Sequence, residues 1–115
     1  AVVFPRKIDN KYLMLHRFDP DICVAYSDEF KRWYDIRSLM GPRHKSWDSW
    51  KIGAAGTPIE LNEGWLCIYH GVNYEKVYSL GVFMLDKDDP EQVLARSKKP
   101  IFSTLFRPVS GKKTG

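Results

Sequence analysis

The chain has 115 residues, of which 43% are hydrophobic, 14% aromatic and 28% charged, a composition that supports a packed core and excludes a disordered chain. No run of about 18 apolar residues occurs and the first residues lack a signal-peptide pattern, so neither a membrane partner nor a leader is expected. The formal net charge is +4, but the basic residues are scattered among 14 acidic ones, which disfavours a nucleic-acid partner. Either the cations form an ordinary solvated surface, or a few of them converge on a small anion.

Four apolar runs predict β-strands, in chain order at residues 12–17, 22–27, 64–70 and 77–85. Turn-forming residues such as Asp, Asn, Pro and Gly separate these runs. No apolar stripe with helical spacing extends over 11 or more residues. The chain is therefore predicted to be all-β.

Two cysteines, Cys23 and Cys67, lie within these apolar runs. A metal site needs several ligands at short spacing, and a disulfide framework needs more cysteines than two. The pattern therefore predicts buried free thiols in a reducing compartment, a cytoplasmic location and no metal site.

An internal repeat relates the two halves of the chain. The first strand of each half matches at an offset of 53 residues and the second at 58, as a hairpin five residues longer in the second copy would give. The matched pairs are Pro5 with Pro58, Tyr12 with Trp65, Arg17 with His70, Ile22 with Leu80, Val24 with Val82, and Asp28 with Asp86.

A repeat of about 50 residues built from four short strands is typical of a β-propeller blade. The alternative is two β-meanders that share turn chemistry. The propeller reading places repeat 1 at about 1–40, a linking segment at 41–56 and repeat 2 at 57–102, within a partial propeller over 1–109, with a tail at 110–115. Since propellers close with about four to eight blades, the chain is expected to be part of a longer protein or of a homo-oligomer.

Arg17 and His70 occupy equivalent strand ends in the two repeats, so both could face one cavity. A guanidinium grips an oxyanion with two parallel N–H groups, and an imidazole donates a hydrogen bond or carries charge near neutral pH. The alternatives are a surface ion pair for Arg17 and a structural strand-end role for His70.

Residues 46–58 are the most unusual stretch, because two tryptophans flank an Asp and a Ser and are followed by one Lys and several small residues. Tryptophan beside polar groups suits sugar rings, so Trp47 and Asp48 are predicted to bind sugar. The alternative is a loop that packs between blades. Asp28 and Asp86 are predicted to be turn residues, and no carboxylate pair has a spacing that indicates a glycosidase.

Several motifs in the right order resemble glycoside hydrolase family 130 from Ala1 to about Pro100. The clearest are Phe4-Pro5-Arg6-Lys7-Ile8, Leu15-His16-Arg17, Trp47-Asp48-Ser49 with Lys51-Ile52-Gly53, and Gly64-Trp65-Leu66 with Ile68-Tyr69-His70. Members of this family are five-bladed β-propellers. Many are inverting phosphorylases that cleave β-mannosides with inorganic phosphate and release mannose 1-phosphate, and some are hydrolases.

The resemblance implies that Arg17, Lys51, His70 and, less directly, Tyr78 line a phosphate pocket. It implies a β-mannoside oligosaccharide and inorganic phosphate as the partners, with phosphate as co-substrate and no cofactor. It also implies that the catalytic acid, an Asp, and a second phosphate-binding Arg lie upstream of Ala1, and that the last blade follows Pro100.

The chain is thus expected to be a central fragment that carries the phosphate side of the site, has no catalytic residue of its own and is inactive alone. The alternatives are a β-mannoside hydrolase of the same family and a non-catalytic sugar-binding or assembly module.

Overall fold

The computed structural model describes residues 1–103, so the predicted tail at 110–115 lies outside the described residues. These residues form strands joined by turns and loops, and the described part holds no helix that could cross a membrane. The strands are β1 (Val2–Val3), β2 (Tyr12–Phe18), β3 (Asp21–Ser27), β4 (Tyr34–Met40), β5 (Lys51–Ala54), β6 (Ile59–Leu61), β7 (Gly64–Val72), β8 (Tyr78–Leu85), β9 (Val93–Arg96) and β10 (Phe102–Ser103). The prediction of an all-β chain is confirmed.

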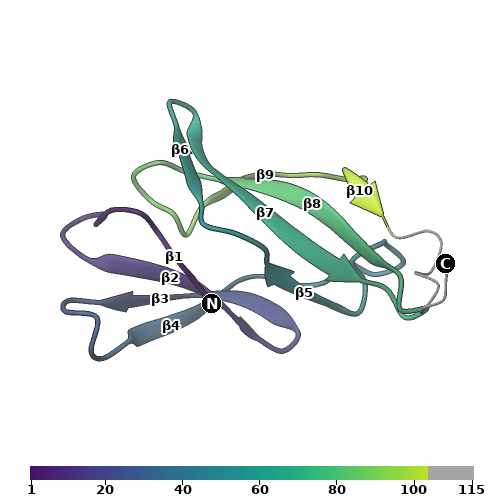
Figure 1. Ribbon diagram of the computed structural model, residues 1–115, viewed down its shortest axis with the longest axis horizontal. Helices are drawn as coiled ribbons and strands as arrows, with labels where there is room; N and C mark the ends of the chain where they lie inside the picture. The colour runs from purple at the N-terminus through teal and green to yellow at the C-terminus, as the bar shows by residue number, and fades with distance from the viewer. Residues whose placement is uncertain (104–115) are drawn as a thin grey trace, which may run out of the picture.

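The strands make two antiparallel sheets that lie side by side (Figure 1). The first has the order β1-β2-β3-β4. In the second, β7 and β8 are central; β5 and β6 share the outer edge of β7, and β9 and β10 share the outer edge of β8. Each sheet is therefore four strand positions wide, and the strands at the edges of the second sheet are interrupted.

The repeat seen in the sequence is present in the pairing of the strands. Arg17 lies opposite Ile22 in the β2–β3 hairpin, and their repeat equivalents His70 and Leu80 lie opposite each other in β7–β8. The extra residues of the second copy fall in the hairpin between β7 and β8, as the change of offset predicts. The boundaries of the repeats stay a prediction; β5, inside the segment predicted as a link, hydrogen-bonds to β7 of the second sheet.

The core fills the space between the sheets. Alternate residues of the central strands are buried, which is the pattern of a strand with one face on a core. Phe4, at the start of the first sheet, packs edge-to-face on the fully buried Trp65 of β7, with 5.1 Å between the ring centroids. Cys23 and Cys67 are buried free thiols, as predicted.

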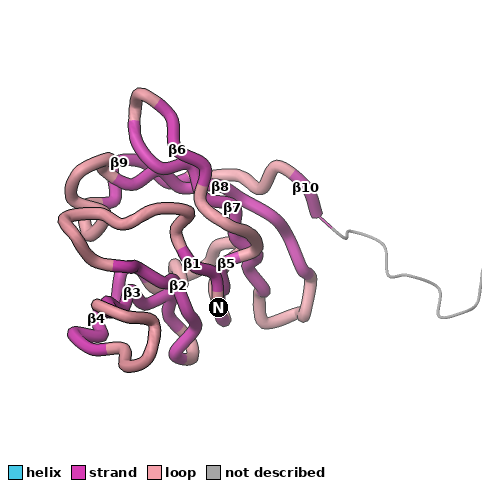
Figure 2. Tube along the Cα trace, turned by 60° about the vertical axis from the view of Figure 1, so that its left-hand side comes forward, coloured by secondary structure: helices cyan, strands magenta, loops and turns pink. Residues whose placement is uncertain are grey.

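Strand β5 lies near the centre of the molecule, while β4 and β10 lie at its periphery (Figure 2). It pairs with β7 and also packs against β2 and β3 of the other sheet. The amide of Ile52 donates to the Pro20 carbonyl oxygen at 3.2 Å, a hydrogen bond from β5 to the β2–β3 hairpin. The position of β5 therefore decides which side chains of the two sheets meet.

Candidate functional site: an anion pocket between the sheets

Arg17, at the end of β2, and His70, near the end of β7, line one cavity of about 160 Å³. Gly53 and Ala54 of β5 also line it. The sequence prediction that these two repeat-equivalent residues face one cavity thus agrees with the geometry. Arg17 comes from the first sheet and His70 from the second, so the cavity exists only where the sheets meet.

Gly53 makes this meeting sterically feasible. It lies opposite His70 in the β5–β7 ladder, and a Cβ atom at this position would be 2.9 Å from His70 Cε1. The same atom would be 3.7 Å from Arg17 Nε. Because carbon atoms in contact are normally about 3.5–4.0 Å apart, any larger residue would push the imidazole out of its place.

The electrostatics of the pocket favour an anion. His70 is half-buried, and this burial, together with the nearby positive charge of Arg17, lowers the pKa of its imidazole below the ordinary value of 6.5. The ring is therefore neutral at pH 7, with one nitrogen as donor. A bound anion would offset the repulsion from Arg17 and raise that pKa again. Asp19, whose carboxylate lies 3.5 Å from Arg17 Nε, is 69% exposed and screens the guanidinium only weakly.

Lys51 and Tyr78 lie one row further along the second sheet. Both are opposite Val72, so they share the face of the sheet that carries Gly53 and His70. The Lys51 ammonium is 4.6 Å from the centre of the Trp50 ring and lines a neighbouring cavity. The structure thus brings Arg17 and His70 to one cavity and Lys51 to the neighbouring one, while Tyr78 lies across β7 from Lys51 and is in the lining of neither.

Asp48 and Trp47 lie on the opposite face of that sheet. Asp48 is fully buried under Gly71, and its carboxylate accepts hydrogen bonds from Arg43 at 2.9 Å, Arg96 at 2.8 Å and the Tyr69 hydroxyl at 2.7 Å. Burial alone would raise the pKa of Asp48, but these hydrogen bonds outweigh it and lower the pKa. The carboxylate is therefore ionised and holds the loop that precedes Lys51 against the sheet.

Trp47 is also engaged in packing, since its indole donates to the Lys98 carbonyl at 2.9 Å and its ring lies 5.4 Å from that of Tyr69. This geometry corresponds to the packing loop that the sequence left open as the alternative, and sugar binding by Trp47 and Asp48 stays an untested prediction. Sequence reasoning missed Arg43 and Arg96, because nothing in their local sequence shows that they meet at a buried carboxylate.

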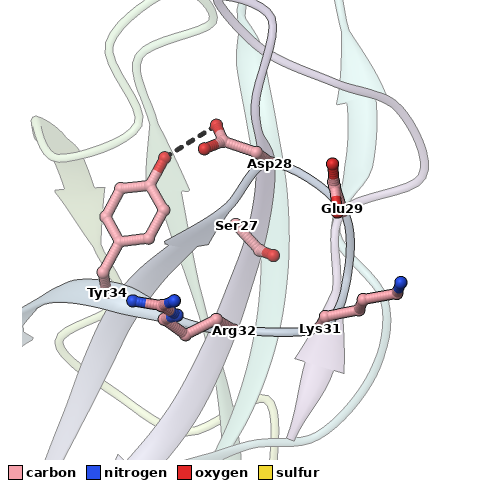
Figure 3. Close-up of a pocket in the computed structure, with 6 residues that line it drawn as sticks. All are labelled: Ser27, Asp28, Glu29, Lys31, Arg32 and Tyr34. Atoms are coloured by element: carbon pink, nitrogen blue, oxygen red, sulfur yellow. Dashed lines mark hydrogen bonds between the residues drawn. The ribbon is translucent and has the colours of Figure 1, made fainter.

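A larger cavity of about 450 Å³ lies at the other end of the first sheet, around the turn after β3 (Figure 3). It is lined by Ser27, Asp28, Glu29, Lys31, Arg32 and Tyr34, and the Tyr34 hydroxyl donates to Asp28 at 2.9 Å. Acidic and basic groups alternate here and no charge of one sign converges, so this cavity is a weaker candidate. Among residues 1–103, no cluster of three or more His, Cys, Asp or Glu is arranged to hold a metal ion.

The Asp48 cluster gives a stability prediction. Replacing Asp48 by Asn leaves Arg43 and Arg96 without their counter-charge, so the free energy of unfolding should fall by about 3 kcal/mol at pH 7. Since the pKa of Asp48 is lower in the folded state than in the unfolded state, its contribution is present above the unfolded value of about 3.9 and is lost as the pH falls through the folded one. Urea denaturation at pH 7 and pH 3 measures both effects.

The matched control is Asp88→Asn, which removes the same charge from an exposed turn and should change stability by less than about 0.5 kcal/mol. Equal effects of the two variants at pH 7 would contradict the structural role of Asp48.

Comparison with known proteins agrees with this architecture. A family model described as beta-1,4-mannooligosaccharide phosphorylase, that of glycoside hydrolase family 130, matches residues 1–104. The chain is 46% identical over 101 residues to a 1,2-beta-oligomannan phosphorylase of Thermoanaerobacter sp. strain X514, covering 88% of this chain and 34% of that protein. It is 42% identical over 113 residues to a beta-1,4-mannooligosaccharide phosphorylase of Ruminococcus albus, covering 90% of this chain and 33% of that one.

Among solved structures, the beta-1,2-mannobiose phosphorylase of Listeria innocua, determined with beta-1,2-mannobiose, aligns with a TM-score of 0.84 and 40% sequence identity. The alignment covers 88% of this chain and 30% of that one. The chain thus spans about a third of the length of the relatives it matches, and its two sheets correspond to about two blades of their propeller. It belongs to glycoside hydrolase family 130.

Proposed function

We propose that this chain supplies the phosphate-binding part of the active site of a β-mannoside phosphorylase, which cleaves β-mannosides with inorganic phosphate and releases mannose 1-phosphate. The observation that carries the proposal is the convergence of Arg17 and His70 on one small cavity across Gly53. Its substrate class rests on the relatives of 41–50% identity, which are named as phosphorylases of mannobiose, oligomannan or mannooligosaccharide.

Phosphate carries one to two negative charges near neutral pH and needs several fixed donors to replace its water. The planar guanidinium of Arg17 offers two parallel N–H groups, and the neutral imidazole of His70 offers one. Lys51 has a flexible four-carbon stem, so its ammonium can swing from the Trp50 ring toward an anion in the cavity. The Tyr78 hydroxyl is the fourth proposed donor.

In the proposed reaction a phosphate oxygen attacks the anomeric carbon of mannose, the glycosidic C–O bond breaks and the leaving oxygen takes up a proton. The residues of this chain hold and orient the nucleophile, which removes much of the entropic cost of the encounter. No residue of this chain is assigned as the acid; that role falls to the Asp that the resemblance implies outside it.

The family also contains hydrolases, in which water replaces phosphate as the nucleophile. A water molecule does not need a pocket lined by a guanidinium and an imidazole with a lysine beside it, whereas phosphate does. The arrangement of cations therefore favours phosphorolysis.

Phosphate binding by the chain itself tests the first step. Arg17→Ala should weaken the binding of inorganic phosphate roughly tenfold, the effect expected for loss of a charge-assisted hydrogen bond. Isothermal titration calorimetry measures this, with Arg32→Ala as the matched control. The Arg32→Ala substitution removes the same charge from the cavity at the other end of the first sheet and should leave the affinity for phosphate unchanged (Figure 3). If both variants weakened phosphate binding equally, the binding would depend on the overall positive charge of the chain and not on the Arg17 pocket.

The reaction is tested with the protein expressed from its complete reading frame. It should convert a β-mannobiose to mannose 1-phosphate only when phosphate is present, and Lys51→Ala or His70→Ala should abolish this turnover. Release of free mannose at a rate independent of phosphate would overturn the proposal in favour of a hydrolase. Binding of oligosaccharide without turnover at any phosphate concentration would favour a sugar-binding module.

A further inference from the structure

A third cavity, of about 340 Å³, lies beside the anion pocket and contains an aromatic shelf formed by Trp50 and Tyr74. The two rings are stacked, with 6.0 Å between centroids and 27° between their planes. The rest of the lining is Asp19, Pro20 and Lys51. Tyr74 is 72% exposed, so one large aromatic side chain is presented to solvent instead of being used in the core.

The fold holds this shelf in place without using Tyr74 as a packing residue. Tyr74 lies in the β7–β8 hairpin, whose turn is built by Asn73: its side-chain oxygen accepts from the amides of Glu75 and Val77, each at 3.0 Å. Trp50 is fixed by its own amide, which donates to the Val72 carbonyl oxygen at 2.8 Å. The backbone under both rings is thus ordered by other groups, and the exposed ring of Tyr74 is left available to a ligand.

The polar groups around the shelf are of two kinds. Lys51 is a donor, with its ammonium 4.6 Å from the Trp50 ring centre, and Asp19 is an acceptor whose side chain is 69% exposed. A ligand that fits must have an apolar face to stack on the rings and hydroxyl groups that both donate and accept at its edge. A pyranose ring has this combination, whereas a purely apolar ligand would make no polar contact with Lys51 or Asp19.

The cavity that holds the shelf lies next to the anion pocket. Asp19 lines the cavity that holds the shelf, and its Oδ1 lies 3.5 Å from Nε of Arg17, which lines the anion pocket. Lys51 lines the cavity of the shelf and Gly53 lines the anion pocket; the two residues are two positions apart on the same face of β5. A sugar on the shelf would therefore lie next to an anion held by Arg17 and His70.

We infer that Trp50 and Tyr74 form a sugar-binding subsite that takes a pyranose ring of the β-mannoside, with Asp19 accepting hydrogen bonds from its hydroxyl groups. This inference rests on the proposed function for the identity of the sugar. The extra length of the β7–β8 hairpin, compared with β2–β3, is what delivers Tyr74 to this subsite.

Indole N–H resonances in ¹⁵N–¹H NMR spectra of the chain test the subsite. Addition of β-mannobiose in phosphate-free buffer should move the Trp50 resonance. The resonances of Trp47 and Trp65, whose indoles donate to backbone carbonyls, should stay in place. A Trp50 resonance that does not move while the others do, or that stays fixed at the highest sugar concentration, would overturn the inference.

Variants separate stacking from general exposure. Tyr74→Ala should weaken sugar binding roughly tenfold, or about 1.4 kcal/mol, whereas Tyr74→Phe keeps the ring and should retain it. Phe18→Ala is the matched control, since Phe18 is 71% exposed on the corresponding hairpin of the first sheet and does not line the cavity. Unchanged affinity in Tyr74→Ala, or equal loss in Phe18→Ala, would contradict the subsite.

A parallel titration with inorganic phosphate distinguishes this inference from the proposed function. Sugar binding that depends on Tyr74 without phosphate binding at Arg17 would refute the phosphate site and leave the subsite standing. Phosphate binding that depends on Arg17 without a response of Trp50 to sugar would refute the subsite alone.

Discussion

The close approach of β5 to both sheets is the constraint on which the rest of the structure depends. β5 is hydrogen-bonded to β7 in the second sheet, and its Ile52 amide is hydrogen-bonded to Pro20 in the first. Because β5 is held from both sides, side chains of both sheets lie close to its backbone. At Gly53 the space that a side chain would fill is occupied by the His70 imidazole, and the Arg17 guanidinium lies next to it.

The position of β5 also depends on a buried polar cluster around Asp48. The segment before β5 is fixed by the buried Asp48, whose carboxylate is held by two arginines and a tyrosine on the far side of the sheet. Because a paired buried charge is costly to move, the start of β5 has little freedom. Lys51 and Gly53 follow within five residues of Asp48, so their positions are fixed by the same cluster. One buried cluster thus supports both the proposed phosphate site and the aromatic shelf beside it.

Much of the fold could be predicted from the sequence where burial and pattern coincide. The strands at β2, β3, β7 and β8 are apolar and were predicted within two residues of their bounds, and the repeat correctly paired Arg17 with His70. β4 was not predicted, because four of its seven residues are exposed and polar positions hide its period. β5 is short and rich in small residues, so its membership in the second sheet depends on contacts that no local pattern reveals.

The site was predictable only in part, for a related reason. Strand register places Arg17 and His70 at equivalent ends, and the sequence contains that register. It does not show on which face of the sheet a loop lies, so the packing of Asp48 and Trp47 against the face opposite His70 could not be predicted. In the structure Asp48 lies buried under Gly71, while Trp50 lies at the edge with Tyr74.

Whether the approach of β5 to His70 positions the proposed phosphate site is tested most directly by the dissociation constant for inorganic phosphate of Gly53→Ala compared with Gly56→Ala. A Cβ atom at Gly53 would meet His70 at 2.9 Å, whereas at Gly56 it would meet no atom within 4 Å. Gly53→Ala should weaken phosphate binding roughly tenfold and alter the His70 resonance, whereas Gly56→Ala should bind phosphate as the unsubstituted chain does. Equal phosphate affinity in the two variants would contradict this role of β5.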